Sequence, residues 1–151
     1  MSSPVPACFR APEKVRRIAL VAESYERLLG RPLVETGNDP VAALWHAPRA
    51  IVAHGPESDP LFFFGNAAAL AAFEYEPEAF IGLPSRLSAE APLREERQAL
   101  LDRVSARGFI DDYAGVRIGS SGRRFRIAQA TVWNLVDGYG RIHGQAASFE
   151  P

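Results

Sequence analysis

The chain has 151 residues, of which 47% are hydrophobic and 23% are charged, and its formal net charge is −1. These values are ordinary for one soluble globular domain, and a domain of this length buries roughly 70% of its unfolded surface. A net charge so close to zero provides no general attraction to nucleic acid or to an acidic membrane surface.

A single cysteine excludes an internal disulfide and a multi-cysteine zinc site. No apolar run approaches the roughly 20 residues that span a bilayer, and the first ten residues lack the pattern of a secretory signal. The three histidines are too scattered for a metal-site motif, and no phosphate-binding or dinucleotide-binding glycine motif occurs. We therefore expect a cytoplasmic protein with no membrane or nucleic-acid partner. The sequence identifies no cofactor.

Residues 1–47 are predicted to form an arm followed by two helices. The arm, Met1–Ala11, is rich in proline and serine and is expected to be loose. From Pro12 to Gly30, apolar residues recur at steps of three and four, which predicts an amphipathic helix. Asp39 is placed to cap a short second helix. We expect the apolar stripe of the first helix to cover either the outer face of a sheet or a second subunit, and we expect a homodimer.

Residues 48–151 are predicted to form an α+β core. Short apolar runs at 50–54 and 60–64 predict a hairpin, and Asn66 then stands where a helix begins. Further helices are predicted at 78–81 and 92–107. Three strands are predicted at 110–118, 124–136 and 141–149, joined by turns that contain glycine. This order predicts a five-stranded antiparallel sheet with helices on one face.

Short sequence words between Asp59 and Phe149 carry a resemblance to a known family. The words are Asp59-Pro60-Leu61-Phe62, Asn66, Phe73, Leu83-Pro84-Ser85-Arg86, Arg94 with Arg97, Asp112-Tyr113, Gly115-Val116-Arg117, Gly122-Arg123-Arg124-Phe125 and Gly144-Gln145-Ala146-Ala147. Together they resemble the MEKHLA domain, a PAS-related family. That family includes free-standing bacterial proteins and the C-terminal module of plant class III homeodomain–leucine zipper factors. The chain lacks the homeodomain and the zipper, so the resemblance implies the free-standing bacterial type and a role in sensing or interaction.

Six residues are candidate ligand contacts, and no catalytic or metal-binding residue is assigned. They are Asn66, Phe73, Arg86, Gln129, Thr131 and Trp133. In PAS-like folds the position of Asn66 can reach a ligand, whereas the alternative is a helix cap. Arg86 follows a helix-breaking loop and is the best candidate among seven arginines for binding an anion; the alternative for these arginines is pairing with nearby carboxylates.

Gln129, Thr131 and Trp133 are predicted to share one strand face with Phe125 and Ile127. A mostly apolar face with one or two polar groups is typical of a small-molecule pocket, and the alternative is a packed core in which Gln129 bonds to backbone. Gln145 and Ser148 fall on opposite faces of the last strand, so at most one of them joins a given pocket.

Three functions are compatible with this sequence. The first is a PAS-like sensory module that binds a small organic ligand between sheet and helices and signals through protein contacts. The second is a ligand-free interaction domain whose interior is closed by aromatic residues, namely Phe62, Phe64, Phe73, Phe80, Phe125 and Trp133. The third is a small cone-shaped α+β enzyme that uses Asp112 or His143 as a base.

Overall fold

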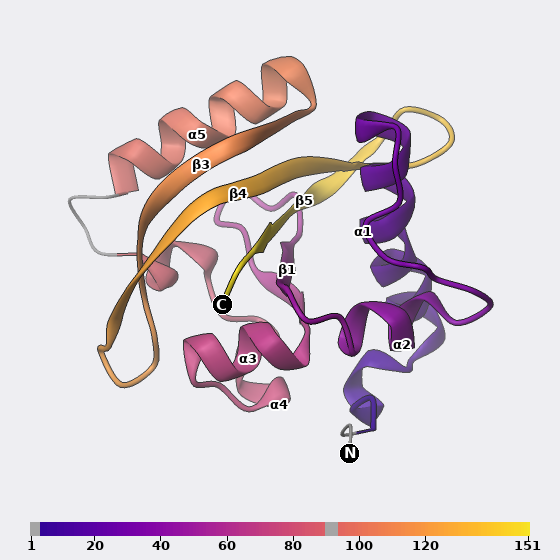
Figure 1. The fold of residues 1–151 in the computed structure, drawn as a ribbon, viewed down its shortest axis with the longest axis horizontal. Helices are drawn as coiled ribbons and strands as arrows, with labels where there is room; N and C mark the ends of the chain where they lie inside the picture. Colours follow the sequence, from indigo (N-terminus) through magenta and orange to yellow (C-terminus); the bar gives the residue numbers. More distant parts are fainter. Residues whose placement is uncertain (1–3, 90–93) are drawn as a thin grey trace.

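Five antiparallel strands form a single sheet in the computed structural model, which describes residues 4–89 and 94–151. The strands are β1 (Ala50–His54), β2 (Phe62–Gly65), β3 (Phe109–Ile118), β4 (Arg124–Val136) and β5 (Ile142–Phe149). Their order across the sheet is β2-β1-β5-β4-β3, so the C-terminal strand lies in the centre (Figure 1). This arrangement confirms the predicted α+β class and the predicted sheet.

Helices lie on both faces of this sheet (Figure 1). The helical elements are η1 (Ala7–Phe9), α1 (Pro12–Leu29), α2 (Pro40–Trp45), α3 (Ala67–Phe73), α4 (Pro77–Phe80), η2 (Ser85–Ser88) and α5 (Arg94–Arg107). The inner face is covered by α3, α4, η2 and α5, and the N-terminal elements cover the outer face. The first two residues of the helix predicted at 92–107 lie outside the described residues.

The apolar stripe of α1 packs on the outer face of the sheet, mainly over β4. Trp133 of β4 donates a hydrogen bond from Nε1 to the carbonyl of Val21 over 3.1 Å. Tyr25 packs edge-on against the same indole, with ring centroids 4.9 Å apart. Ser24, fully buried, exchanges hydrogen bonds with the backbone of Val136. The apolar stripe of α1 was predicted to cover either the outer face of a sheet or a second subunit. The structure shows that it covers the outer face of the sheet of its own chain.

Part of the N-terminal arm is fixed, which corrects the expectation of a loose segment. Phe9 is fully buried and packs against Phe64 at 5.1 Å and Trp45 at 6.0 Å between ring centroids. Burying an aromatic ring removes a large apolar area from water, which stabilises this short 3₁₀ turn on the sheet. Residues before and after position 48 share one hydrophobic cluster, and the proposed boundary there stays a prediction.

The pairing of β3 with β4 contains two compensating register shifts. Ile110 pairs with Val132, Tyr113 with Ala130, and Gly115 with Ile127, so each strand carries one extra residue. On β4 the extra residue falls next to Gln129, whose φ of 51° is in the left-handed region. A bulge of this kind exchanges the faces to which the following side chains point.

The bulge divides the residues that were predicted to share a face. Ile127, before the bulge, lines the inner face, whereas Thr131 and Trp133 lie on the outer face with α1. The prediction of one continuous face from Phe125 to Trp133 is therefore wrong. The sequence showed only uninterrupted alternation, because no glycine marks the bulge in this strand.

Candidate ligand-binding cavity

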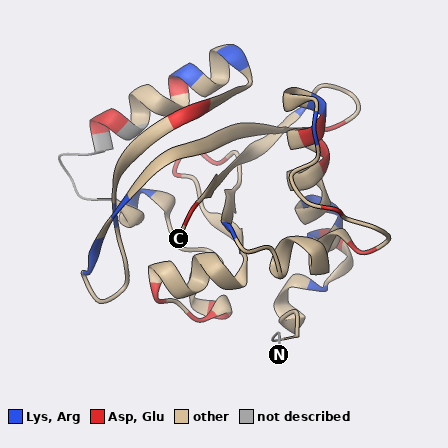
Figure 2. Cartoon of the chain, in the orientation of Figure 1, with Lys and Arg blue, Asp and Glu red and all other residues tan. Residues whose placement is uncertain are grey.

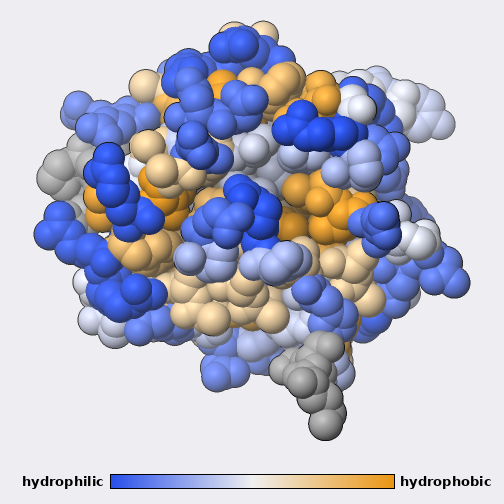
Figure 3. Space-filling view, in the orientation of Figure 1, coloured by the Kyte–Doolittle hydropathy of each residue, from blue (hydrophilic) through white to orange (hydrophobic). Residues whose placement is uncertain are grey.

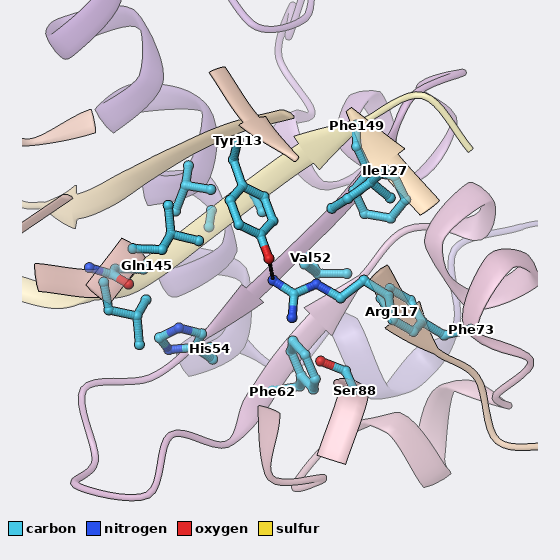
Figure 4. Close-up of a pocket in the computed structure, with 15 residues that line it drawn as sticks. Val52, His54, Phe62, Phe73, Ser88, Tyr113, Arg117, Ile127, Gln145 and Phe149 are labelled. Carbon is cyan, nitrogen blue, oxygen red and sulfur yellow. Dashed lines mark hydrogen bonds between the residues drawn. The ribbon is translucent and has the colours of Figure 1, made fainter. Parts of the chain in front are cut away.

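A small cavity lies between the inner face of the sheet and the helical elements α3, η2 and α5 (Figure 4). Its volume is about 60 Å³. Apolar side chains form most of its wall. They include Val52, Phe62, Phe73, Leu100, Ile127 and Phe149. A cavity needs about 10–15 Å³ to hold one water molecule, so this one has room for a very small organic molecule.

The guanidinium of Arg117 is the charged group of this cavity. It extends from β3 into the space between Tyr113, Phe62 and Ser88 (Figure 4). Its Nη2 donates a 2.8 Å hydrogen bond to the hydroxyl of Tyr113, and its central carbon lies 5.2 Å from the centroid of that ring. Burial lowers the pKa of Arg117 from its ordinary value, with a smaller opposing effect of Tyr113. An arginine side chain nevertheless keeps its charge at physiological pH.

Gln145 of β5 contributes a second polar group. Its Nε2 donates to Oδ1 of Asn134 over 3.0 Å, and Asn134 in turn donates to the carbonyl of Val104 in α5. The other amide atom of Gln145, Oε1, is buried and has no hydrogen-bond partner among the described residues. A buried acceptor without a donor is unfavourable, by about 1–3 kcal/mol. This oxygen therefore favours a bound molecule that can donate a hydrogen bond.

His54 and Ser88 complete the polar part of the wall. The Nδ1 atom of His54 lies 2.9 Å from the carbonyl oxygen of Gly55, which accepts the proton carried by Nδ1. The hydroxyl of Ser88 donates to the carbonyl of Ser85 over 2.6 Å. Both side chains are thus oriented by the backbone beside them, and they border the cavity in fixed positions.

The tip of the β3–β4 hairpin fixes the position of Phe73 at one end of the cavity. Ser120 donates its backbone N–H to the carbonyl of Phe73 over 2.9 Å, and Arg123 donates to the carbonyl of Ala72 over 2.7 Å. The carbonyl groups at the end of a helix otherwise lack partners, so these bonds hold the last turn of α3 against the hairpin. Phe73 packs on Phe125 and Phe149 from this position.

Of the six predicted ligand contacts, Phe73 alone lines this cavity. Asn66 is fully buried, and its side chain makes four hydrogen bonds. Its Oδ1 caps α3 by accepting from Ala69 and also accepts from Ile51, while Nδ2 donates to the carbonyls of Leu44 and Arg49. The predicted helix cap is confirmed, and these bonds occupy both ends of the amide.

The remaining four candidates are dispersed. Arg86 forms an ion pair with Asp59 at 3.1 Å, and both side chains are about half exposed. Trp133 is buried beneath α1. Gln129 and Thr131 border an open concavity on the outer face, together with Arg49 and Ser148. The prediction that Gln145 and Ser148 lie on opposite faces is confirmed, because only Gln145 borders the inner cavity.

The groups proposed for an enzyme lie away from the cavity. Asp112 is exposed and pairs with Arg103 at 3.4 Å, and His143 contacts Asp137 at 2.7 Å beside the β4–β5 turn. Within residues 4–89 and 94–151, no group of histidine, cysteine and acidic side chains is arranged to hold a metal ion. None of the helices in the described part of the chain is long and apolar enough to cross a membrane.

Sequence reasoning gave too little weight to Tyr113, Arg117 and Gln145. All three belong to words that carried the family resemblance, yet Arg117 was considered only as one of seven arginines and Gln145 only as one of two residues that could join a pocket. What distinguishes these arginines is the position of their neighbours in space, which local sequence patterns do not show. Arg86 has a carboxylate partner in the structure, and Arg117 has none among the described residues.

Comparisons with known proteins agree with this fold. A family model described as the MEKHLA domain matches residues 15–151, which includes most of α1. A PAS domain of a protein from Colwellia psychrerythraea is similar at a TM-score of 0.61 and 15% identity, covering 72% of this chain and 89% of that one. A search of proteins with curated functions gave no match.

Two light-oxygen-voltage proteins are also similar in structure. An RNA-binding light-oxygen-voltage receptor has a TM-score of 0.59 at 14% identity, covering 72% of this chain and 31% of that chain. A light-oxygen-voltage domain studied with a flavin analogue has a TM-score of 0.54 at 20% identity, covering 72% and 81%. At these identities the likeness shows a shared PAS-like fold.

Proposed function

This chain belongs to the MEKHLA domain family, and we propose that it is a PAS-like sensory module that binds a small organic ligand in the inner cavity and signals through protein contacts. The observation that carries the proposal is the cavity itself. It combines an apolar wall with a few oriented polar groups, from Arg117, Tyr113, Gln145 and His54. That combination is typical of sites that bind small molecules specifically.

The proposed ligand is smaller than a flavin. The name of one similar light-oxygen-voltage structure refers to a flavin analogue. The cavity of this chain, about 60 Å³, is well below the roughly 300 Å³ at which sites for drug-sized ligands begin. The chain's one cysteine, Cys8, lies in η1 and outside the cavity wall. These observations support a compact ligand.

Helix α5 is the proposed output element. Two of its residues, Leu100 and Val104, are buried, in a small cluster with Ile110 and Val132 that is separate from the main core. Leu100 and Leu101 also form part of the cavity wall. The exposed residues of α5 include both acidic and basic ones, among them Glu96, Asp102 and Arg103, and Figure 2 shows both charges along this helix. A ligand that contacts Leu100 and Leu101 would bias the position of α5, and a partner protein would read that position from the outward side.

A ligand-free interaction domain is the second candidate, and the aromatic packing around the cavity favours it. Phe62 stacks on Phe80 at 4.3 Å, and Phe73 packs edge-on against Phe125 at 5.1 Å. These rings pack closely beside the cavity, and two of them, Phe62 and Phe73, form part of its wall. In this reading the small cavity holds only water.

Self-association and a cytoplasmic location also belong to the proposal. Because the apolar side of α1 packs on β4 of the same chain, a homodimer would use other surfaces. Tyr139 and Ile142, 91% and 54% exposed, are apolar residues available for such a contact. On the face shown in Figure 3, apolar patches are separated by polar side chains. A partner on that face would meet a mixed surface.

Native mass spectrometry of freshly purified protein, compared with the denatured mass, tests the proposal. We expect a small extra mass that disappears on denaturation, and the same spectrum reports whether the chain is a monomer or a dimer. Protein without extra mass, combined with unchanged NMR spectra after incubation with a cell metabolite extract, would contradict ligand binding. That result would favour the ligand-free interaction domain as the function of this chain.

A further inference from the structure

The guanidinium of Arg117 lies in the cavity wall. Among residues 4–89 and 94–151, no carboxylate forms an ion pair with it, and no residue that lines the cavity is acidic. Six other arginines do form ion pairs with carboxylates: Arg10, Arg17, Arg49, Arg86, Arg103 and Arg123. A charge that is partly withdrawn from water and left unpaired is unfavourable, so an anion of matching shape would bind here.

The guanidinium retains the capacity to hold such an anion. Its hydrogen bond to the Tyr113 hydroxyl uses one of its five N–H groups. The two parallel N–H groups of a guanidinium fork match the two oxygens of a carboxylate. Tyr113 also fixes the position of the fork, because the ring lies beside the guanidinium carbon at 5.2 Å. Arg117 is thus oriented in advance for a planar anion.

Gln145 contributes a hydrogen-bond acceptor, whereas Arg117 contributes donors. This side chain is 8% exposed, its Nε2 is held by Asn134, and its Oε1 is buried without a donor among the described residues. In Figure 4 the amide of Gln145 lies near His54, at one end of the labelled side chains. The aliphatic part of Arg117 lies at the opposite end, beyond Tyr113. A ligand between the two would therefore meet a cation at one end and a hydrogen-bond acceptor at the other.

The charge and the size of the cavity restrict the class of ligand further. Of the residues that the structure describes, Arg117 is the only lysine or arginine that borders the cavity, and the remaining wall is largely apolar. One fixed positive charge balances one negative charge, which favours a monocarboxylate over a phosphate that carries up to two. The cavity volume of about 60 Å³ admits only a few carbon atoms.

We propose that the cavity binds a small monocarboxylic acid that carries one hydrogen-bond donor, with its carboxylate on Arg117 and its donor on Oε1 of Gln145. Lactate is the simplest probe of this class. The inference rests on the proposed function, because it assigns a chemical class to the ligand of the same cavity.

Four probes separate the contributions, each titrated into the whole protein and followed by amide and side-chain NMR shifts. Lactate has both groups, propionate lacks the hydroxyl, lactamide lacks the charge, and inorganic phosphate is the alternative anion. We expect lactate to bind more tightly than propionate and lactamide, phosphate to be without effect, and the largest shifts at Tyr113, Arg117 and Gln145.

Three substitutions test the two contacts, and a fourth serves as a control. Arg117→Met should lower the affinity for lactate and propionate alike by about tenfold or more, because it removes a charge-assisted hydrogen bond. Gln145→Met should reduce the affinity for lactate to that for propionate, and it should leave the affinity for propionate unchanged. Arg86→Met is the matched control at an arginine outside the cavity, and it should leave both affinities unchanged. Arg117→Lys, which keeps the charge, should bind with intermediate affinity and covers the case in which Arg117→Met fails to fold.

The outcomes distinguish this inference from the proposed function. Equal binding of lactamide and lactate, undiminished lactate affinity in folded Arg117→Met and Arg117→Lys, binding of phosphate in place of lactate, or a bound molecule that is not a carboxylic acid would each overturn the carboxylate assignment and leave a cavity ligand in place. No shift with any of the four probes, together with no extra mass in the native spectrum and no response to metabolite extract, would overturn both.

Discussion

The indole of Trp133 on β4 donates its Nε1–H to the backbone carbonyl of Val21 on α1, over 3.1 Å. This bond joins residues 112 positions apart and fixes α1 on the outer face of the sheet. The ring itself is fully buried. The N-terminal helix is thereby part of the sheet's packing, and substitutions at this contact report on both elements at once.

Trp133→Phe should lower the free energy of unfolding by about 2 kcal/mol. The substitution removes the bond to Val21 and leaves a cavity where the larger ring of the indole was. For a chain of this size, thermal denaturation should shift by roughly 4–8 °C. Tyr139→Phe is the control, because Tyr139 is 91% exposed and its substitution should leave the melting temperature unchanged. Equal melting temperatures for wild type and Trp133→Phe would contradict the role of this contact.

Asn66→Ala should be more destabilising than the loss of an ordinary helix cap. Loss of a cap costs about 1 kcal/mol, but this side chain also bonds Ile51 and two carbonyl groups in a buried site, so we expect about 3 kcal/mol in total. Asp39→Ala, which removes the cap of α2 and an exposed ion pair with Arg10, is the comparison and should cost about 1 kcal/mol, because an exposed pair contributes little. Urea denaturation measures both. Similar losses for the two variants would show that the extra bonds of Asn66 contribute little.

Gly144→Ala should prevent correct pairing of β1 with β5. Gly144 has φ of +133°, and a Cβ atom there would overlap the carbonyl oxygen of His54 on the neighbouring strand. Because the obstacle is backbone, it cannot turn away, and we expect an unfolded or aggregated protein by circular dichroism. Gly138→Ala is the matched control, since nothing lies within 4 Å of its Cβ position. A folded Gly144→Ala variant with wild-type stability would refute the close approach.

The contact between Asp137 and His143 makes stability depend on pH in the acid range. A hydrogen bond from His143, and then one from the backbone N–H of Arg141, lower the pKa of Asp137 to about 2. In the unfolded chain the pKa of this aspartate is about 3.9. The lowered value means that the contribution is complete above about pH 5 and is lost as pH falls toward 2.

Thermal denaturation of wild type and Asp137→Asn between pH 6 and pH 2 measures this contribution. We expect wild type to be the more stable at pH 6 and the difference to shrink as the pH approaches 2. Asp111→Asn, at an exposed carboxylate of β3, is the control and should follow the wild-type curve. A difference between wild type and Asp137→Asn that stays constant down to pH 2 would contradict the assignment.

Backbone amides of α5 should exchange with solvent faster than those of α1. Of the described α5 side chains only Leu100 and Val104 are buried, whereas α1 buries five residues, and helices with few buried contacts open at lower free energy. Val104→Ala should accelerate exchange in α5 and leave α1 unaffected, and Ala106→Ser on the exposed side should change neither. Hydrogen–deuterium exchange measured by mass spectrometry resolves the two helices. Equal protection of α1 and α5 would argue against α5 as the output element.

The local elements of this protein are predictable from its amino-acid sequence. Pro12 and Gly30 bound α1, Asp39 and Asn66 cap their helices, and glycine-containing turns join the last three strands. These signals act within a few residues, through backbone conformation and nearby hydrogen bonds, so they are readable without the fold. The order of these elements, with the family words, was sufficient to predict the PAS-like sheet.

The contacts between distant side chains, in contrast, are known only from the three-dimensional fold. The bulge next to Gln129 depends on pairing with β3, and it moved Thr131 and Trp133 to the outer face. Arg86 pairs with Asp59, whereas Arg117 has no carboxylate partner among the described residues and bonds to Tyr113. Packing between distant segments sets the positions of these neighbours. The candidate site was therefore beyond local patterns, since its geometry arises from contacts between residues far apart in the chain.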